Sequence, residues 1–291
     1  MMKKALRGPA HAAGEITERE RSAMLPWREQ IIEFPGGRMN AVSFGKGPRP
    51  MLLISGLNLR DVRGPDAAFG LWALYRGFGR DHTVWCFDRR EDLPVHYSLS
   101  QIAEDTAAGM VALGLRDADV LGVSQGGMIA QYLAIEHSSL VRRLVLGVTL
   151  SRPNSTLTAR IGDWCASARQ GDLARIAEDY MRSNYSPGYL RRVGPFLPLL
   201  IRAMKTMSPE RFLTLAESCL TCDTYGRLGE IRCPVLVLGG GRDRIVTADG
   251  SREIAGRLGC EIHIYENGGH SVYEEQAKDF NRRVSEFFSR T

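Results

Sequence analysis

Short apolar segments alternate with helix-length segments over much of this chain. Such alternation predicts strands joined by helical crossovers, which place helices on both faces of a parallel sheet. Two earlier segments, 30–34 and 38–44, are joined by Pro35-Gly36-Gly37 and indicate an antiparallel hairpin. We therefore expect an α/β fold with a mostly parallel, doubly wound sheet. The predicted parallel strands are 50–55, 83–87, 119–123, 144–148, 234–239 and 261–266.

The alternation stops in the stretch 153–226, where the sequence predicts helices only. This stretch therefore reads as a helical block inserted into a parallel-sheet domain. We divide the chain into an N-terminal extension (1–28), a core (29–152 and 227–291) and the inserted block. The helices expected in the block are 158–170, 172–184, 189–207 (interrupted by Pro195 and Pro198) and 209–221.

The net charge and the hydropathy of the chain limit which kinds of partner it is expected to bind. The 291 residues carry a formal net charge of +5, but the basic residues are scattered and form no stripe with aromatic residues. We therefore expect no nucleic-acid partner. No apolar run approaches the roughly 20 residues that cross a bilayer, so no membrane segment is expected. Met1-Met2-Lys3-Lys4 could open a secretion signal, but residues 5–15 contain Arg7, Gly8, Pro9 and His11 instead of an apolar core.

The six cysteines show no spacing typical of a disulfide framework. This pattern favours reduced thiols and a cytoplasmic location. Cys219 and Cys222 form a C-x-x-C pair, but no second pair or histidine cluster accompanies them. We interpret them as small apolar residues on a helix, and we predict neither a metal nor a cofactor.

Ser124 lies in Gly122-Val123-Ser124-Gln125-Gly126, between a predicted strand and a predicted helix. Small residues two positions before and after a serine allow a sharp strand-to-helix turn that exposes its hydroxyl at the helix N-terminus. This placement predicts a catalytic nucleophile. The alternative is that Ser124 only caps the helix.

A serine nucleophile needs a base and a group that orients the base. His270 follows the last predicted strand, at the carboxyl edge of the sheet, where open α/β sheets place their sites. Asp243 follows the preceding strand and completes the chain order Ser, Asp, His. We predict His270 as the base and Asp243 as its partner. The alternatives are a solvated loop histidine, and for Asp243 a helix cap or an ion pair with Arg242 or Arg244.

The chain resembles the α/β-hydrolase superfamily, in the branch that has a helical cap and a serine nucleophile. The resemblance covers roughly 30–288 and implies that 153–226 is the cap. Besides the three residues above, it rests on Phe87-Asp88-Arg89-Arg90, on Leu228, Ile231, Cys233 and Pro234 before a strand, and on Gln276, Phe280, Phe287 and Phe288 of the last helix.

The loop after the first parallel strand departs from that family. Ser55-Gly56-Leu57 stands where the family usually has His-Gly. The resemblance implies that the backbone N–H groups of Leu57 and Gln125 form the oxyanion hole. A backbone donor survives a change of the neighbouring side chain. Losing one such donor costs on the order of 3 kcal/mol in comparable enzymes, so the departure bears on rate and substrate.

Related dehalogenases and epoxide hydrolases carry aspartate where Ser124 stands. A serine there implies acyl chemistry, namely hydrolysis of an ester, thioester or lactone of a small acyl substrate. Carbon–carbon hydrolases and perhydrolases share the triad and remain alternatives, as does a receptor that kept the fold. The sequence carries no signal for the oligomeric state.

The substrate pocket is expected between the carboxyl edge of the sheet and the cap. Candidate substrate-binding residues are Asn58, Trp164, Phe196 and Met204, although packing inside the cap would also explain the last three. Residues 152–227 hold 11 basic and 7 acidic side chains. This excess of positive charge favours an anionic or neutral substrate.

Overall fold

A computed structural model describes residues 25–196, 198, 199, 201 and 207–290. Its centre is one eight-stranded sheet with the order β1-β2-β4-β3-β5-β6-β7-β8. The first three strands in this order pair antiparallel, and β4 to β8 are parallel, which confirms the predicted mostly parallel sheet. The strands are β1 Trp27–Phe34, β2 Gly37–Phe44, β3 Arg49–Ile54, β4 His82–Arg90, β5 Ala118–Val123, β6 Val141–Gly147, β7 Val235–Gly240 and β8 Glu261–Tyr265.

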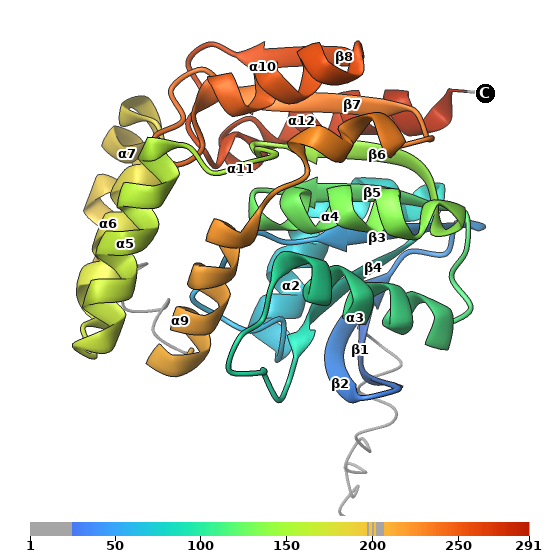
Figure 1. Cartoon of the computed structure of the whole chain (residues 1–291), viewed down its shortest axis with the longest axis horizontal. Helices are drawn as coiled ribbons and strands as arrows, with labels where there is room; N and C mark the ends of the chain where they lie inside the picture. Colours follow the sequence, from blue (N-terminus) through green and yellow to red (C-terminus); the bar gives the residue numbers. More distant parts are fainter. Residues whose placement is uncertain (1–24, 197, 200, 202–206, 291) are drawn as a thin grey trace, which may run out of the picture.

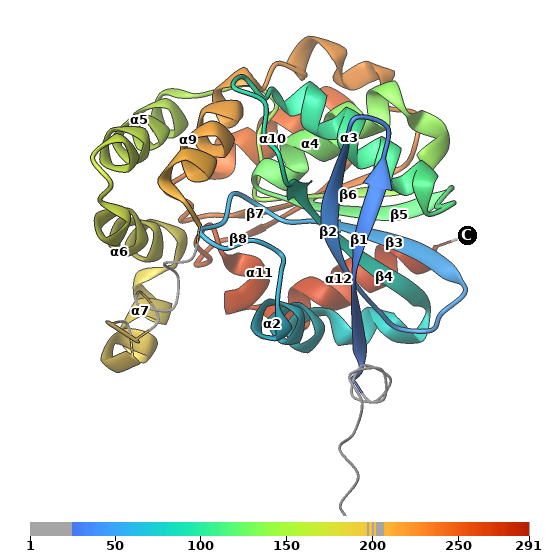
Figure 2. The same ribbon diagram turned by 90° about the horizontal axis from the view of Figure 1, so that it is seen from below.

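Helices cover both faces of the sheet (Figures 1 and 2). One face carries α3 (Leu99–Ala112), α4 (Gln125–Glu136) and α10 (Thr247–Leu258), and the other carries α2 (Pro65–Tyr75), α11 (Val272–Glu275) and α12 (Ala277–Ser289). Each face has its own apolar cluster. The central strand β5 is buried along its whole length, as expected for a parallel strand covered on both sides.

Local signals explain several helix boundaries. Ser98 and Gln101 form a capping box at the start of α3, in which each side chain accepts from the other's backbone N–H. Gly259 ends α10 in the left-handed conformation (φ 62°). By contrast, α2 and the 3-10 helix η1 (Arg76–Arg80) were not predicted. β1 begins at Trp27, inside the predicted extension, because this tryptophan packs against α2.

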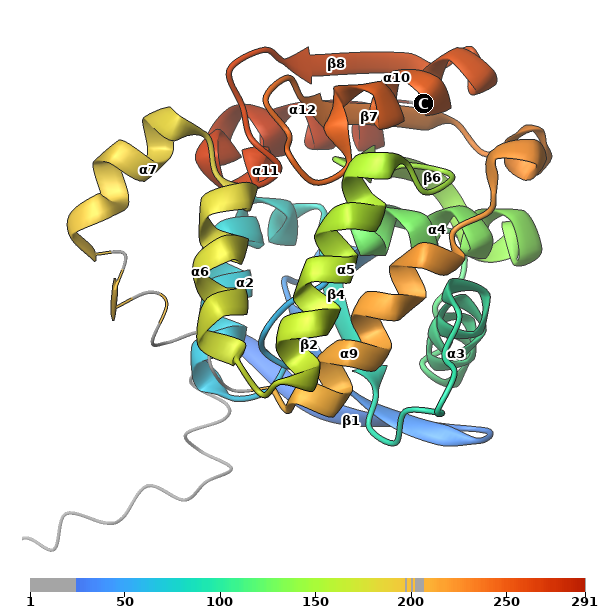
Figure 3. The same cartoon turned by 60° about the vertical axis from the view of Figure 1, so that its left-hand side comes forward.

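Between β6 and β7 the described part of the chain is helical, and Figure 3 shows these helices beside one end of the sheet. The elements are α5 Ser155–Arg169, α6 Leu173–Asn184, α7 Pro187–Val193, η3 Gly194–Phe196, α9 Pro209–Ser218, η4 Cys219–Thr221 and η5 Tyr225–Glu230. α5 packs against both α6 and α9. The first part of the interrupted helix expected at 189–207 begins two residues earlier, at Pro187, because Ser186 caps its start, and it ends at Val193, just before Gly194-Pro195. Residues 198, 199 and 201 are helical again.

Within the described residues, no helix combines the length and apolar character needed to cross a membrane. The same residues contain no group of three or more His, Cys, Asp or Glu side chains that could hold a metal ion.

Candidate active site

The carboxyl ends of the parallel strands bring distant residues together. Ser124 directly follows β5, Asp243 follows β7, and His270 follows β8. The strand order reverses beside β5, because β3 and β4 lie on one side of it and β6 to β8 on the other. Open α/β sheets bind their ligands at such a switch point.

Ser124 sits on a strained turn. Its φ of 54° and ψ of −123° are rare for any residue other than glycine. The neighbouring glycines make the turn possible because side chains there would collide with backbone. A Cβ on Gly122 would lie 2.8 Å from Gly127 Cα, and one on Gly126 would overlap the carbonyl oxygen of Ile54. The turn therefore depends on the Gly-x-Ser-x-Gly pattern.

A continuous chain of hydrogen bonds links three side chains. His270 Nε2 lies 2.8 Å from Ser124 Oγ, and His270 Nδ1 lies 2.8 Å from Asp243 Oδ2. Since a carboxylate only accepts, the proton is on Nδ1, and Nε2 is free to accept the serine hydroxyl proton. The histidine is only 3% exposed, which keeps this contact away from bulk water.

The alternatives that the sequence left open predict other contacts for Ser124 and Asp243. Ser124 makes no side-chain capping bond to α4. Asp243 Oδ2 accepts from His270 Nδ1, and its other oxygen accepts from the backbone N–H groups of Ile245 (2.8 Å) and Val246 (3.0 Å). Two backbone donors and the imidazole thus hold the carboxylate in one orientation.

The segments that carry the predicted oxyanion donors meet at Ser124. A Cβ on Gly56 would lie 3.0 Å from Ser124 Cβ, so Leu57 follows a residue in direct contact with the nucleophile. The Ser124 carbonyl, which belongs to the same peptide as the Gln125 N–H, accepts from Thr149 Oγ1 at 2.8 Å. The Leu57 carbonyl accepts from the Tyr180 hydroxyl at 3.1 Å.

A small cavity of about 20 Å³ lies in front of Ser124. This is space for about one water molecule. Among the described residues, His270 is the one titratable nitrogen base in its wall, and no Asp, Glu, Lys or Arg contributes. The wall consists of Gly56, Leu57, Ser124, Met128, Leu157, Ile161, Trp164, Tyr180, Asn184, Cys219, Ile245, His270 and Tyr273.

A second cavity, of about 300 Å³, lies next to the first and shares Tyr180 with it. Its wall mixes apolar side chains with polar ones, among them Asn58, Asp61, Ser271 and Glu274. Burial raises the pKa of the Glu274 carboxyl, and the neighbouring Glu275 raises it further. The Tyr185 hydroxyl donates to Glu274 and acts in the opposite direction.

The four candidate substrate residues fall in different places. Trp164 lines the cavity at Ser124, and Asn58 lines the second cavity. Phe196, in η3, is 64% exposed and lines neither of these two cavities, so the structure does not bring it to the site. Met204 lies outside the described residues.

Sequence reasoning missed several residues of the cavity wall. Leu157 and Ile161, which were missed, lie four residues apart and share one face of α5 with Trp164, which was among the candidates. The helical spacing of these apolar residues is visible in the sequence, but it does not indicate which part of the protein this face of the helix contacts. Tyr180 and Cys219 gave no signal of this kind.

Comparisons with known proteins agree with this geometry. The model of the alpha/beta hydrolase family matches residues 51–283. A 3-oxoadipate enol-lactonase from Acinetobacter baylyi is 26% identical over 268 residues, which cover 87% of this chain and 93% of the relative. A pimeloyl-[acyl-carrier protein] methyl ester esterase from Neisseria meningitidis is 27% identical over 214 residues, with coverages of 67% and 80%.

A solved structure has the same fold. The enol-lactonase from Burkholderia xenovorans superposes with a TM-score of 0.78 at 20% identity, covering 90% of this chain and all of that one. The family model spans most of the chain and includes the nucleophile turn, Asp243 and His270. The chain belongs to the alpha/beta hydrolase family.

Proposed function

We propose that the protein is a serine-dependent hydrolase that cleaves ester, thioester or lactone bonds of a small substrate through an acyl-enzyme. The observation that carries this proposal is the unbroken pair of 2.8 Å contacts from Ser124 through His270 to Asp243. They join a nucleophile on a strained turn to a base that is oriented for proton transfer.

The reaction runs in two halves. His270 Nε2 takes the Ser124 proton as Oγ attacks the substrate carbonyl, and the N–H groups of Leu57 and Gln125 donate to the resulting oxyanion. The imidazolium then protonates the leaving oxygen or sulfur, and the bond to the acyl carbon breaks. In the second half a water molecule attacks the acyl-enzyme, His270 takes its proton, and the acid leaves as Ser124 regains a proton.

The cavity walls favour a short, uncharged acyl group. The space next to Ser124 is small, and its described wall is mostly apolar. The basic excess that the sequence shows at 152–227 does not reach this wall in the described part of the chain. We place the leaving group in the larger cavity beyond Tyr180, whose wall includes polar side chains. On this proposal 153–226 acts as the cap that closes the acyl side.

The relatives support acyl chemistry without selecting one substrate. Two of them are named for lactone and methyl ester hydrolysis. A Klebsiella pneumoniae 2-hydroxy-6-oxononadienedioate/2-hydroxy-6-oxononatrienedioate hydrolase is 46% identical, but over only 22% of this chain. Carbon–carbon hydrolysis by the same triad is therefore the second candidate. The six free cysteines support the reducing cytoplasm as the location.

Turnover of p-nitrophenyl acetate and butyrate tests the proposal. The wild type should hydrolyse both, and Ser124→Ala should lower kcat by at least about 10³-fold. Ser289→Ala, on the exposed end of α12, is the matched serine control and should hydrolyse like the wild type. A wild type that cleaves diketones but no ester would favour carbon–carbon hydrolysis. A Ser124→Ala variant as fast as the wild type would refute the site.

A further inference from the structure

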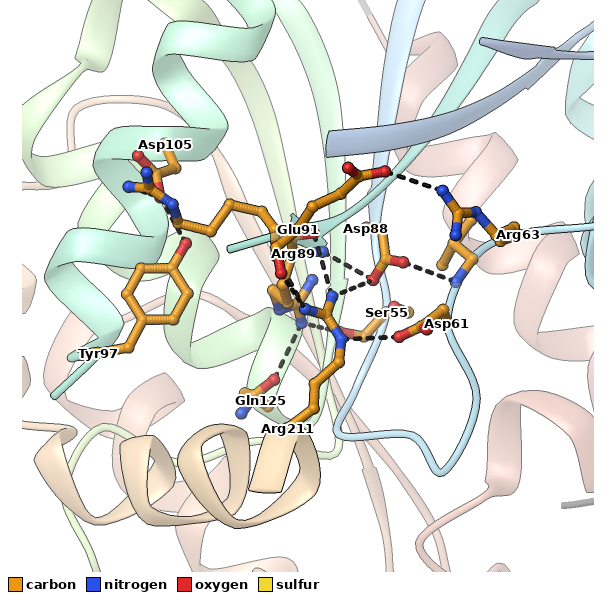
Figure 4. A network of polar contacts seen from close by, with 12 residues as sticks. Ser55, Asp61, Arg63, Asp88, Arg89, Glu91, Tyr97, Asp105, Gln125 and Arg211 are labelled. Atoms are coloured by element: carbon orange, nitrogen blue, oxygen red, sulfur yellow. Dashed lines mark hydrogen bonds and ion pairs between the residues drawn. The ribbon is translucent and has the colours of Figure 1, made fainter. Parts of the chain in front are cut away.

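Arg89, at the end of β4, lies between the two segments that carry the oxyanion donors (Figure 4). Its Nη2 donates to the carbonyl of Ser55 at 2.7 Å and to Oε1 of Gln125 at 3.0 Å. Ser55 comes two residues before the Leu57 N–H, and the Gln125 side chain belongs to the residue that carries the other N–H. A single guanidinium nitrogen therefore bridges the two halves of the oxyanion hole.

The bridge is sealed from solvent. Arg89 is 5% exposed and Gln125 is 1% exposed, so water does not compete for these hydrogen bonds. Asp88 lies beside Arg89, and its Oδ1 accepts from the Arg89 backbone N–H at 2.7 Å. A charge-assisted hydrogen bond in such surroundings is stronger than one in water.

The other end of the Gln125 side chain contacts the inserted helices. Its Nε2 donates to the Leu215 carbonyl at 2.7 Å and to Ser218 Oγ at 3.1 Å, both on α9. Arg211, also on α9, donates to the Arg89 carbonyl at 3.2 Å. Gln125 is thus held from two sides, by the sheet through Arg89 and by α9.

We propose that Arg89 and the Gln125 side chain are positioning residues that set the separation of the Leu57 and Gln125 N–H groups. This inference rests on the proposed acyl-transfer function. Ser55 stands where related chains carry histidine. In this chain Arg89 holds the loop that contains Ser55 and Leu57, through its hydrogen bond to the Ser55 carbonyl. The loop is therefore fixed without help from the Ser55 side chain.

This role has a kinetic signature that a purely structural role lacks. The oxyanion forms only during the reaction, so misplaced donors weaken transition-state binding more than ground-state binding. Loss of the bridge should lower kcat and leave KM nearly unchanged. A misplacement of about 1 Å in such a site can cost about 10²-fold.

The test is a double-mutant cycle of Arg89→Met, Gln125→Met and the combined variant, assayed on p-nitrophenyl butyrate. We expect each single variant to lose about 10- to 100-fold in kcat with KM within about threefold. Affinity for a trifluoromethyl ketone, which forms a tetrahedral adduct, should fall by the same factor as kcat/KM. The loss in the combined variant should be well below the product of the two single losses. Each single variant already removes the same hydrogen bond, the one between Arg89 and Gln125.

The matched control is Arg90→Met. Arg90 is the next residue on β4, but its side chain pairs with Asp105 at 3.4 Å and with the Gly36 carbonyl, away from Ser124. It should keep the wild-type kcat. Equal losses in Arg90→Met and Arg89→Met would reduce the effect to general destabilisation and overturn the proposal.

Other outcomes are equally decisive. An Arg89→Met or Gln125→Met variant with wild-type kcat, or one that raises KM alone, would contradict the positioning role while leaving the proposed function intact. If Arg89→Met does not fold, Gln125→Met still decides, because it leaves the Arg89 to Ser55 bond in place. A wild type without any acyl hydrolysis would remove the proposed function itself.

Discussion

Ser124 shows how one residue can carry the local strain of a site. Its positive φ is unfavourable for a serine by about 1–3 kcal/mol, and the surrounding backbone holds it there. The strain keeps Oγ at the start of α4 and 2.8 Å from His270 Nε2. The sequence was sufficient to predict this residue, because glycines at fixed positions are what such a turn requires.

Arg89 was harder to predict for a physical reason. Its motif was visible, but a side chain with several rotatable bonds can reach many acceptors. Its actual partners, the Ser55 carbonyl and Gln125 Oε1, are 34 and 36 residues away in the sequence. No local pattern determines such a contact, which follows from how β3, β4 and β5 align in the sheet.

Cys219 gives a prediction about reactivity. It lines the cavity at Ser124, yet burial raises the pKa of its thiol to about 12. Only about one molecule in 10⁴ would carry the reactive thiolate at pH 8. Iodoacetamide at that pH should therefore leave esterase activity unchanged and Cys219 unmodified over an hour, as peptide mass mapping would show. Loss of activity in step with alkylation of Cys219 would show that this thiol is accessible and ionised.

Among the elements, α5 supplies much of the cavity wall beside Ser124. Leu157, Ile161 and Trp164 present one buried face to the cavity. The sequence predicted this helix at 158–170, and it begins three residues earlier because Asn154 Oδ1 accepts from the Leu157 N–H at 2.8 Å. α2 was missed because it contains Gly70 and carries no capping side chain.

Shortening one side chain on α5 should change acyl-chain preference. Ile161→Ala removes buried volume next to Ser124, so the ratio of kcat/KM for hexanoate to that for acetate esters should rise several-fold, at a stability cost of about 2–5 kcal/mol. Steady-state kinetics on a series of p-nitrophenyl esters measures this ratio. Asp163→Ala, on the exposed side of α5, is the control and should leave it unchanged. An unchanged ratio in Ile161→Ala would mean that the acyl group lies elsewhere.

At the scale of the molecule, the sheet determines the chemistry by gathering residues that are far apart in sequence. Ser124 and His270 are separated by 146 positions, and Asp243 and His270 by 27. Each of the three residues follows a predicted parallel strand, and the carboxyl ends of parallel strands lie at one edge of the sheet. The sequence was therefore enough to expect them together at that edge. The place of the cavities was predicted, but their size and most of their wall were not, because these depend on how α5, α6 and α9 pack over that edge.

Covalent trapping of the nucleophile tests the central claim most directly. The folded wild type is treated with a fluorophosphonate, and the adduct is located by peptide mass mapping. We predict one adduct per chain, on Ser124, with loss of esterase activity in the same proportion, and none on Ser124→Ala. An adduct on another residue, or full esterase activity with Ser124 modified, would contradict the account.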